Sequence, residues 1–397
     1  MKEPVRVLII NHVADLGGAE LMLIKFLEGL DRKRIQPTLL CLEEGPLCDW
    51  CRQHQIPLLW IENNQEFIHI KRSTRLVKLF KALPQFYKTI RYIKKVALKE
   101  DFDLVLTNSV KAHILGSLGA RRLPVIWRLH DIIDTSTFSY YGVKAMAAVA
   151  KRADHISCVS NAVRQALIKS KVPEDKVSVL YNGIEDITYT QRDSFRREWG
   201  IMDHEVAVAL IARLSPEKGH KIFIQAAYHL LKTFPHIKFL IVGGDVFAKE
   251  KTYIKRLKSL VKKLGISDNI IFTGHLNDIP KVLRGIDIFV NVPNKPDSLP
   301  TAIIEAMLAG KPIIASKIGG IPEMIEHGKN GLLIKPNDTL SLVKAIEKII
   351  HDNTFAKEIG DKARDKALKD FNIDNYIDNM TALLEAFKEG QIHETRG

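Results

Sequence analysis

Short apolar runs alternate with longer amphipathic segments along almost the whole chain, and this alternation restricts the fold more than any other feature. A short apolar run bounded by turn residues is typical of a strand buried on both faces, and the amphipathic segment after it is typical of a covering helix. The first strands are expected at 5–13, 37–42, 103–109, 125–131, 155–160 and 177–183. The pattern predicts a parallel sheet with helices on both faces.

The pattern is interrupted once and then resumes. Residues 185–205 are polar and predict a linker with a short helix. A second series of strands is expected at 206–214, 239–244, 270–275, 286–292, 312–316 and 331–334. We therefore predict two doubly wound α/β domains, 1–187 and 188–372, followed by an amphipathic helical segment at 373–397. In such sheets ligands bind beyond the carboxyl ends of the strands, and two facing sheets form a cleft.

Composition narrows the class of protein. Of the 397 residues, 46% are hydrophobic and 26% are charged, which is typical of a soluble globular protein. No apolar stretch is long enough to cross a membrane, and the first apolar run resembles a buried strand more than a secretory signal. We expect a cytoplasmic protein.

Four cysteines are too few for a disulfide scaffold in a chain of this length. Cys48 and Cys51 form a C-x-x-C pair with His54 nearby, but no second pair has the spacing that zinc requires. We favour ordinary helix packing for this pair over metal or redox chemistry.

A net charge of +13 indicates an anionic partner. The segment 71–99 holds ten basic residues and no acidic one, and its apolar residues have helical spacing interrupted by Pro84. One interpretation is a kinked pair of helices packed on the sheet with its basic residues in water. The other, which we favour, is a surface that meets an anionic bilayer at the inner face of the plasma membrane. No nucleic-acid module is recognised, so no nucleic acid is expected as a partner.

Phosphate-binding motifs of the common kinds are missing. No two of the 23 glycines are two positions apart, which excludes the G-x-G-x-x-G fingerprint of a dehydrogenase, and no P-loop is present. The first strand instead leads to Gly17 and Gly18 before a helix. Bare backbone N–H groups at a helix start suit a phosphate, although a simple turn is the alternative.

Two loops of the second half carry charged residues in a suggestive order. In ARLSPEKGHK, Arg213 and Lys218 could neutralise a departing diphosphate without a metal ion, or could be solvated bases. In PNKPDSLPTAIIEAMLAG, Asp297 lies in a loop and can hydrogen-bond sugar hydroxyls. Glu305 lies about two turns into the next helix among apolar residues, where a carboxylate needs a partner.

The spacing of Asp297 and Glu305 resembles the E-x7-E motif of the retaining glycosyltransferases of family four, which have the GT-B fold. Further segments match that family in order along nearly the whole chain. They are LGGAE at 16–20, RLHD at 128–131, VSNAV at 159–163, YNGIE at 181–185, RLSPEKG at 213–219, LIVGGD at 240–245, EAMLAGKP at 305–312 and GGIPEMI at 319–325.

The resemblance implies a role for each matching residue of the second domain. Glu305 would bind the ribose hydroxyls, and Arg213 and Lys218 would grip the diphosphate. Asp297 would hold the donor sugar and its phosphates together with the backbone of Ser298, Leu299, Pro300 and Thr301. The first acid is Asp rather than the more common Glu, which makes a different sugar hydroxyl pattern more plausible.

Other roles follow from the same resemblance. His130 would approach the donor sugar near the reacting carbon, although a packed histidine is the alternative reading. Gly17 and Gly18 would line the diphosphate side, and Gly244 and His275 would flank the nucleotide. The C-terminal helix would return to the first domain.

The reaction implied is transfer of a sugar from a nucleotide-sugar donor to a glycan or lipid-linked acceptor, with retention, in bacterial surface polysaccharide or lipopolysaccharide synthesis. No carboxylate nucleophile is apparent, and D-F-D at 101–103 is interpreted as a turn rather than a metal site. Neither a metal nor a cofactor is expected. The alternatives are a GT-B epimerase, a phosphorylase or a non-catalytic nucleotide-sugar-binding protein. The donor base, the sugar, the acceptor and the oligomeric state cannot be predicted.

Overall fold

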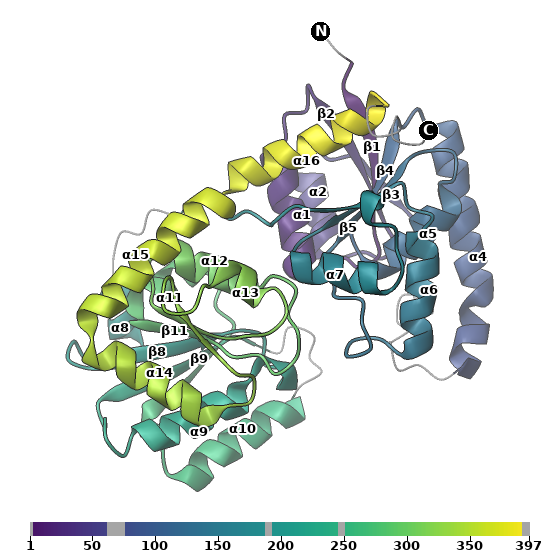
Figure 1. Ribbon diagram of the computed structural model, residues 1–397. Helices are drawn as coiled ribbons and strands as arrows, with labels where there is room; N and C mark the ends of the chain where they lie inside the picture. The colour runs from purple at the N-terminus through teal and green to yellow at the C-terminus, as the bar shows by residue number, and fades with distance from the viewer. Residues whose placement is uncertain (1–2, 62–75, 187–192, 245–250, 391–397) are drawn as a thin grey trace. The chain divides into compact units, whose positions relative to one another are not determined.

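The structure is a computed structural model that describes residues 3–61, 76–186, 193–244 and 251–390 (Figure 1). The chain divides into two compact units. The first unit consists of Met1–Gly183 together with Ile373–Gly397, and the second consists of Ile184–Asn372. The boundary expected at 187 lies outside the described residues.

The first unit is built on a seven-stranded parallel sheet with the order β3-β2-β1-β4-β5-β6-β7. Its strands are β1 Val5–Asn11, β2 Ile35–Cys41, β3 Leu58–Trp60, β4 Leu104–Thr107, β5 Val125–Leu129, β6 His155–Cys158 and β7 Val177–Val179. Sequence order reverses between β1 and β4, which is the point where ligands bind in open parallel sheets.

Helices cover both faces of this sheet. They are α1 Gly18–Glu28, α2 Pro46–Gln53, α4 Leu76–Lys99, α5 Val110–Gly119, α6 Tyr140–Ala150, α7 Asn161–Lys169 and α16 Ile373–Lys388, with a 3-10 turn η1 at Glu174–Lys176. Successive residues of a strand point to opposite faces. Trp127 of β5 accordingly donates to Ser117 of α5 at 2.8 Å, while Arg128 meets the ring of Tyr376 on α16.

The second unit repeats the arrangement with a six-stranded parallel sheet of order β10-β9-β8-β11-β12-β13. Its strands are β8 Val206–Ile211, β9 Ile237–Val242, β10 Ile270–Gly274, β11 Ile288–Asn291, β12 Ile313–Ser316 and β13 Leu332–Ile334. Its helices are α8 Asp193–Glu198, η2 Pro216–Lys218, α9 His220–Leu230, α10 Lys251–Leu264, η3 Ser267–Asn269, α11 Ile279–Gly285, α12 Thr301–Leu308, α13 Ile321–Met324, α14 Thr339–His351 and α15 Asn353–Asp370. Its order reverses between β8 and β11.

The apolar runs became strands for the expected reason. In β8, for example, Ala207, Val208, Ala209 and Leu210 are all fully buried, so both faces of the strand are covered. All twelve predicted strands are present, and the two doubly wound sheets confirm the predicted GT-B architecture. The edge strand β3 was not predicted, because it has only three residues and is partly exposed.

The C-terminal helix belongs to the first unit, as expected. Helix α16 packs on β1, β4 and α1 (Figure 1, yellow). The chain therefore passes between the units twice, after Gly183 and before Ile373. The two connections are paired with each other: the N–H of Ile184 donates to the carbonyl of Phe371 at 2.9 Å, and Ile184 forms a parallel bridge with Asn372.

Residues 76–99 of the basic segment form one helix, α4 Leu76–Lys99, rather than the pair of helices that one of the two interpretations expected. Pro84 lies inside the helix on its exposed side, where the carbonyl that lost its N–H partner can bind water. Residues 71–75 of the predicted segment lie outside the described part of the chain. Among the described helices none is both long enough and apolar enough to span a membrane.

Candidate functional site

In the second unit, the loop after β8 carries both predicted cations. Arg213 is about half exposed and lies 3.7 Å from Glu217. The short turn η2 then ends at Gly219, whose φ of +81° lies in the left-handed region. A Cβ at Gly219 would lie 1.9 Å from the carbonyl oxygen of Val292, so only glycine allows this loop to meet the loop after β11.

Lys218 and Asp297 form an ion pair of 2.5 Å across these two loops. Both side chains are largely buried, with 20% and 15% of their surface exposed. Backbone contacts hold the loops in register: the N–H of Asn294 donates to Glu217 O at 2.9 Å, and its side chain donates to Pro216 O at 3.1 Å. The predicted sugar-binding acid and the predicted diphosphate-binding lysine are therefore neighbours.

The loop that carries Asp297 is also fixed from its other side. The N–H of Gly320 donates to Asp297 O at 2.8 Å, and a Cβ at Gly319 would lie 2.1 Å from that same oxygen. Gly319 has a φ of +60°, a conformation that side chains rarely adopt. Three loops, after β8, β11 and β12, thus form one backbone assembly at the carboxyl edge of the sheet.

Helix α12 begins at Thr301, directly after Ser298, Leu299 and Pro300, and no side chain caps its N-terminus. Glu305 lies in its second turn between buried Ile304 and Ala306. No ion pair or hydrogen bond of its side chain occurs within the described residues, and burial raises the pKa of Glu305 to about 7. A carboxylate in this state is suited to accept hydrogen bonds from a ligand's hydroxyl groups.

Gly244 and His275 lie together at the ends of β9 and β10. The exposed His275 leaves little room beside Gly244, because a Cβ at Gly244 would lie 3.0 Å from the Cβ of His275. Gly244 O accepts the N–H of Leu214 at 3.1 Å, which ties it to the loop that carries Arg213. All predicted residues of the second unit therefore lie at one edge of its sheet.

In the first unit, Asn108 joins two predicted features. Its side-chain oxygen lies 2.9 Å from Nε2 of His130, and its amide nitrogen donates to Ala19 O at 3.3 Å in the first turn of α1. His130 follows β5 and Asn108 follows β4, so adjacent strands bring them together. Burial lowers the pKa of His130 well below its usual value, and the charges of Arg128 and His113 lower it further. His130 is therefore neutral at physiological pH.

Gly17 and Gly18 begin α1, but a carboxylate already lies beside them. Glu20 is 5% exposed, accepts the N–H of Gly17 at 3.2 Å and accepts the side chain of Asn11 at 3.2 Å. Burial raises the pKa of Glu20. A Cβ at Gly18 would meet nothing within 4 Å, so Gly18 is the open position of the pair.

The other candidate motifs have structural roles. Asp103 of D-F-D accepts the N–H of Arg6 at 2.7 Å and lies 3.1 Å from Lys388, in the turn between α4 and β4. Cys41, Cys48, Cys51 and Cys158 are free and buried. Within the described ranges no three His, Cys, Asp or Glu side chains are grouped so that they could hold a metal ion.

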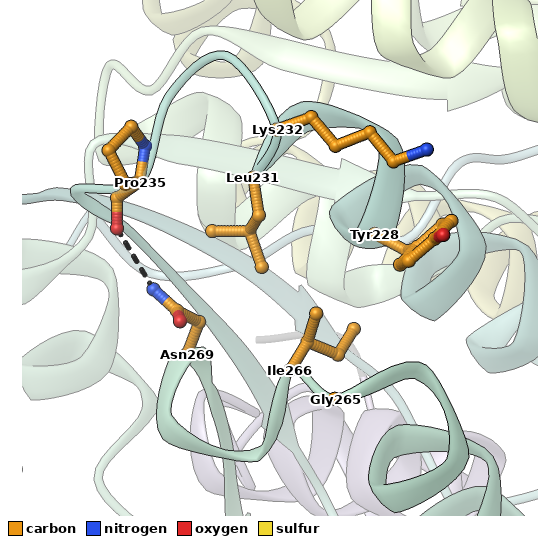
Figure 2. Close-up of a pocket in the computed structure, with 7 residues that line it drawn as sticks. All are labelled: Tyr228, Leu231, Lys232, Pro235, Gly265, Ile266 and Asn269. Carbon is orange, nitrogen blue, oxygen red and sulfur yellow. Dashed lines mark hydrogen bonds between the residues drawn. The ribbon is translucent and has the colours of Figure 1, made fainter.

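A shallow pocket in the second unit lies away from these residues (Figure 2). Tyr228, Leu231, Lys232, Pro235, Gly265, Ile266 and Asn269 line it. Pro235 and Asn269 precede β9 and β10, so the pocket lies at the amino edge of the sheet. The side chain of Asn269 donates to Pro235 O at 3.1 Å across it.

Two family descriptions match successive parts of the chain. Glycosyl transferases group 1 matches residues 191–366, and Glycosyltransferase Family 4 matches residues 16–186. The chain therefore belongs to the family-four, group 1 glycosyltransferases, which the sequence motifs predicted. The match to group 1 falls within the unit that contains Lys218, Asp297 and Glu305.

Individual relatives agree. The Escherichia coli protein named UDP-Gal:alpha-D-GlcNAc-diphosphoundecaprenol alpha-1,3-galactosyltransferase is 26% identical over 389 residues, which cover 93% of each chain. The crystal structure of Anabaena HepE in complex with UDP and glucose is 26% identical, with a TM-score of 0.82 over 96% of this chain and 100% of that one. Sucrose-phosphate synthase of Thermosynechococcus elongatus, at 18% identity and a TM-score of 0.79 over 96% and 98%, shares the fold.

Sequence reasoning missed the residues that hold the site together. Asn108 and Asn294 have no distinctive spacing in the sequence, and their partners lie 89 and 78 positions away along the chain. For Glu20 a signal was present, because it is the last residue of LGGAE and lies three positions after Gly17.

Proposed function

We propose that this protein transfers a hexose from a UDP-sugar to a lipid-linked acceptor, with retention at the anomeric carbon and without an essential metal ion. The observation that carries the proposal is the grouping of Lys218, Asp297 and Glu305 at the carboxyl edge of the second sheet. These are the residues that a nucleoside diphosphate sugar needs: a cation for the diphosphate and acceptors for hydroxyl groups.

The relatives support uridine as the donor base. HepE has been crystallised with UDP and with UDP-glucose, and the Escherichia coli relative is named for UDP-Gal. Both proteins cover nearly the whole chain. A uridine nucleotide carrying glucose or galactose is therefore the donor that we assign.

The chemistry can be divided among the residues. Arg213 and Lys218 stabilise the negative charge that develops on the departing diphosphate. Glu305, as a carboxylate, accepts hydrogen bonds from the ribose hydroxyl groups. Asp297 accepts hydrogen bonds from the donor sugar and also orients Lys218 through their ion pair. Asp297 is engaged by Lys218 and is therefore poorly available as a nucleophile, which favours front-face substitution over the double displacement of retaining glycosidases.

The first experiment is thermal unfolding of the purified protein with UDP, GDP and ADP, each with EDTA and then with magnesium. A ligand that binds only the folded state raises stability by RT ln(1 + [L]/Kd), so UDP should give the largest shift, equal in EDTA and magnesium. The Glu305→Ala variant should lose that shift. Equal shifts with all three nucleotides, or none at millimolar concentration, would contradict the donor assignment.

The second experiment tests transfer. UDP-galactose and UDP-glucose are incubated with a GlcNAc-diphospho-lipid, and UDP release and the lipid product are followed. We expect release that depends on the acceptor and a product with the anomeric configuration of the donor. Conversion of the sugar without acceptor would indicate an epimerase, and UDP binding without any turnover would indicate a binding protein.

We further propose that α4 places the enzyme on an anionic bilayer that carries this acceptor. Leu83, Tyr87 and Leu98 are 52%, 62% and 46% exposed, and their spacing puts them along one side of the helix. Arg91 lies over the Tyr87 ring at 5.7 Å. Exposed apolar and aromatic side chains among basic residues are typical of helices that lie in a membrane interface.

Sedimentation with vesicles tests this surface. Binding to phosphatidylglycerol vesicles and not to phosphatidylcholine vesicles is expected, with a loss of binding at high salt. The double substitution Lys94→Glu/Lys95→Glu in α4 should abolish binding to the phosphatidylglycerol vesicles. Lys255→Glu/Lys258→Glu on α10 is the matched control, since it changes the net charge equally on another exposed basic helix. Equal loss in both variants would show that only net charge matters and would contradict docking through α4.

A further inference from the structure

Arg128 of β5 is a cation buried in the first unit with 1% of its surface exposed. Its guanidinium donates to Ser157 Oγ at 3.0 Å, to Leu180 O at 2.7 Å and to Asn182 Oδ1 at 2.7 Å. Its fourth neighbour is the ring of Tyr376, 5.2 Å from the guanidinium carbon. All of these partners are neutral.

No carboxylate pairs with Arg128 anywhere in the described part of the chain, which is unusual for a buried charge. Arg196 in the second unit shows the ordinary arrangement. It is 2% exposed, donates to three backbone carbonyls and pairs with Asp287 at 3.1 Å. Burial without a counter-charge lowers the pKa of Arg128, so a cation is kept here at a free-energy cost.

The partners of Arg128 lie on both connections between the units. Leu180 and Asn182 immediately precede Gly183, where the chain leaves the first unit. Tyr376 lies in the first turn of α16, just after the chain returns at Ile373. A guanidinium presents five donors in a rigid fork, so one side chain can bind a carbonyl and an amide oxygen of the outgoing segment while it stacks on the returning helix.

Arg128 also lies two residues before His130, on the strand that positions it. His130 is held in turn by Asn108, which reaches the first turn of α1. A displacement of β5 would therefore move His130 relative to the rest of this edge. The same displacement would leave Leu180 O and Asn182 Oδ1 without their donor, which is costly for buried groups.

We propose that Arg128 is a positioning residue that fastens both connections between the units to the strand carrying His130, so that its loss lowers turnover without weakening nucleotide binding. The turnover part of this proposal depends on the proposed function. The role of Arg128 in holding the two connections does not depend on the proposed function, and hydrogen exchange at the connections measures it directly.

The test compares Arg128→Met, Arg128→Lys and the matched control Arg196→Met in the full chain. For Arg128→Met we expect kcat for UDP release from UDP-galactose to fall by about 10- to 100-fold, because positioning errors of an ångström have effects of this size. The Kd for UDP should remain within about twofold, since most of its predicted ligands lie in the second unit and Arg128 contacts none of those in the first, Gly17 and Gly18. Arg128→Lys, which keeps the charge, should recover part of kcat.

Hydrogen exchange at the backbone amides around Ile184 and Asn372 should become faster in Arg128→Met and stay unchanged in Arg196→Met. Arg196→Met should lower the melting temperature without changing kcat per folded molecule. If Arg128→Met does not fold, Asn182→Ala removes a single acceptor and should show the same changes with smaller amplitude.

The outcomes separate the two proposals. Unchanged exchange at the connections, a kcat that stays unchanged as in Arg196→Met, or a UDP affinity that falls together with kcat would overturn the role of Arg128. A wild-type protein that releases no UDP would contradict the proposed function, and the exchange measurement would still decide whether Arg128 fastens the connections.

Discussion

Both sheets reverse their strand order at one point, but the side chains at their carboxyl edges differ. In the second unit the edge carries charges: Lys218 paired with Asp297, Arg213 beside Glu217, and Glu305 with a pKa of about 7. In the first unit burial disfavours the charged forms of two groups at this edge, because it lowers the pKa of His130 and raises that of Glu20. Two amide side chains bind these groups: Asn11 donates to Glu20, and the side-chain oxygen of Asn108 lies 2.9 Å from Nε2 of His130.

Under the proposed function, the two copies of the fold would divide the work of the transfer reaction between them. A diphosphate needs cations and rigid backbone, which the second unit supplies. Hydrogen-bonding side chains such as His130 and Asn108 can orient sugar hydroxyls and an acceptor without competing for the phosphates. The variants that follow test this division between the two units.

The largest effect is expected at Lys218. Lys218→Ala should lower kcat by about 10²–10³-fold, because removal of one group that stabilises developing negative charge has effects of this size. Steady-state UDP release measures it. Lys221→Ala, an exposed lysine of the adjoining helix α9, is the control and should retain wild-type turnover. A small effect at Lys218 would mean that the diphosphate is neutralised elsewhere.

The rigid backbone of the same edge is tested at Gly219. Gly219→Ala should lower the free energy of unfolding by roughly 2–3 kcal/mol and weaken UDP binding, because its Cβ would meet the Val292 carbonyl. Gly265→Ala is the control, since Gly265 also has a positive φ, of +70°, and its Cβ would meet nothing within 4 Å. Urea unfolding and calorimetry compare the two variants, and equal costs would mean that the close approach is unimportant.

The edge of the first unit is tested at His130. His130→Ala should lower kcat by roughly 10- to 100-fold while the Kd for UDP stays unchanged, because a positioned side chain contributes to the reaction step and the nucleotide is held by the other unit. The exposed His54, stacked on Trp50, provides the control variant His54→Ala. A parallel loss of UDP affinity in His130→Ala would break the division between the two edges.

The smallest effect is a pH dependence at Glu305. Only its ionised form can accept two ribose hydroxyls, so UDP affinity should rise by about tenfold from pH 6 to pH 8 if the pKa is about 7. The phosphate of UDP also titrates, and Glu305→Gln isolates that contribution. In the free protein the raised pKa means that the unfolded chain ionises first, so stability should fall between pH 4.5 and about 7. Glu305→Gln should lose this slope, and a wild-type protein without it would contradict the assigned pKa.

The sequence predicted the strands well, because a strand covered on both faces is a continuous apolar run that needs no knowledge of its neighbours. It also predicted the edge of the second unit, whose residues come from three short loops with recognisable spacing. The continuation of α4 through Pro84 was not expected, because the cost of a proline inside a helix depends on whether the freed carbonyl faces water, which the sequence does not reveal.

The edge of the first unit was less predictable for a related reason. His130 was identified only through the family resemblance, and Asn108 was missed. The hydrogen bond of Asn108 to Ala19 joins residues 89 positions apart, and such pairs leave no periodic pattern. The buried Arg128 could not be distinguished from a surface arginine, since its hydrogen-bond partners lie 29 to 54 positions away along the chain.

Helix α16 has a consequence for the order in which the protein matures. Its residues Tyr376, Met380, Leu384 and Phe387 are at most 4% exposed and complete the core of the first unit. A ribosome delivers this helix only after the whole second unit has emerged. The unit that is synthesised first therefore completes its fold last. Its sheet face over β1 and β4 stays uncovered until α16 has been synthesised.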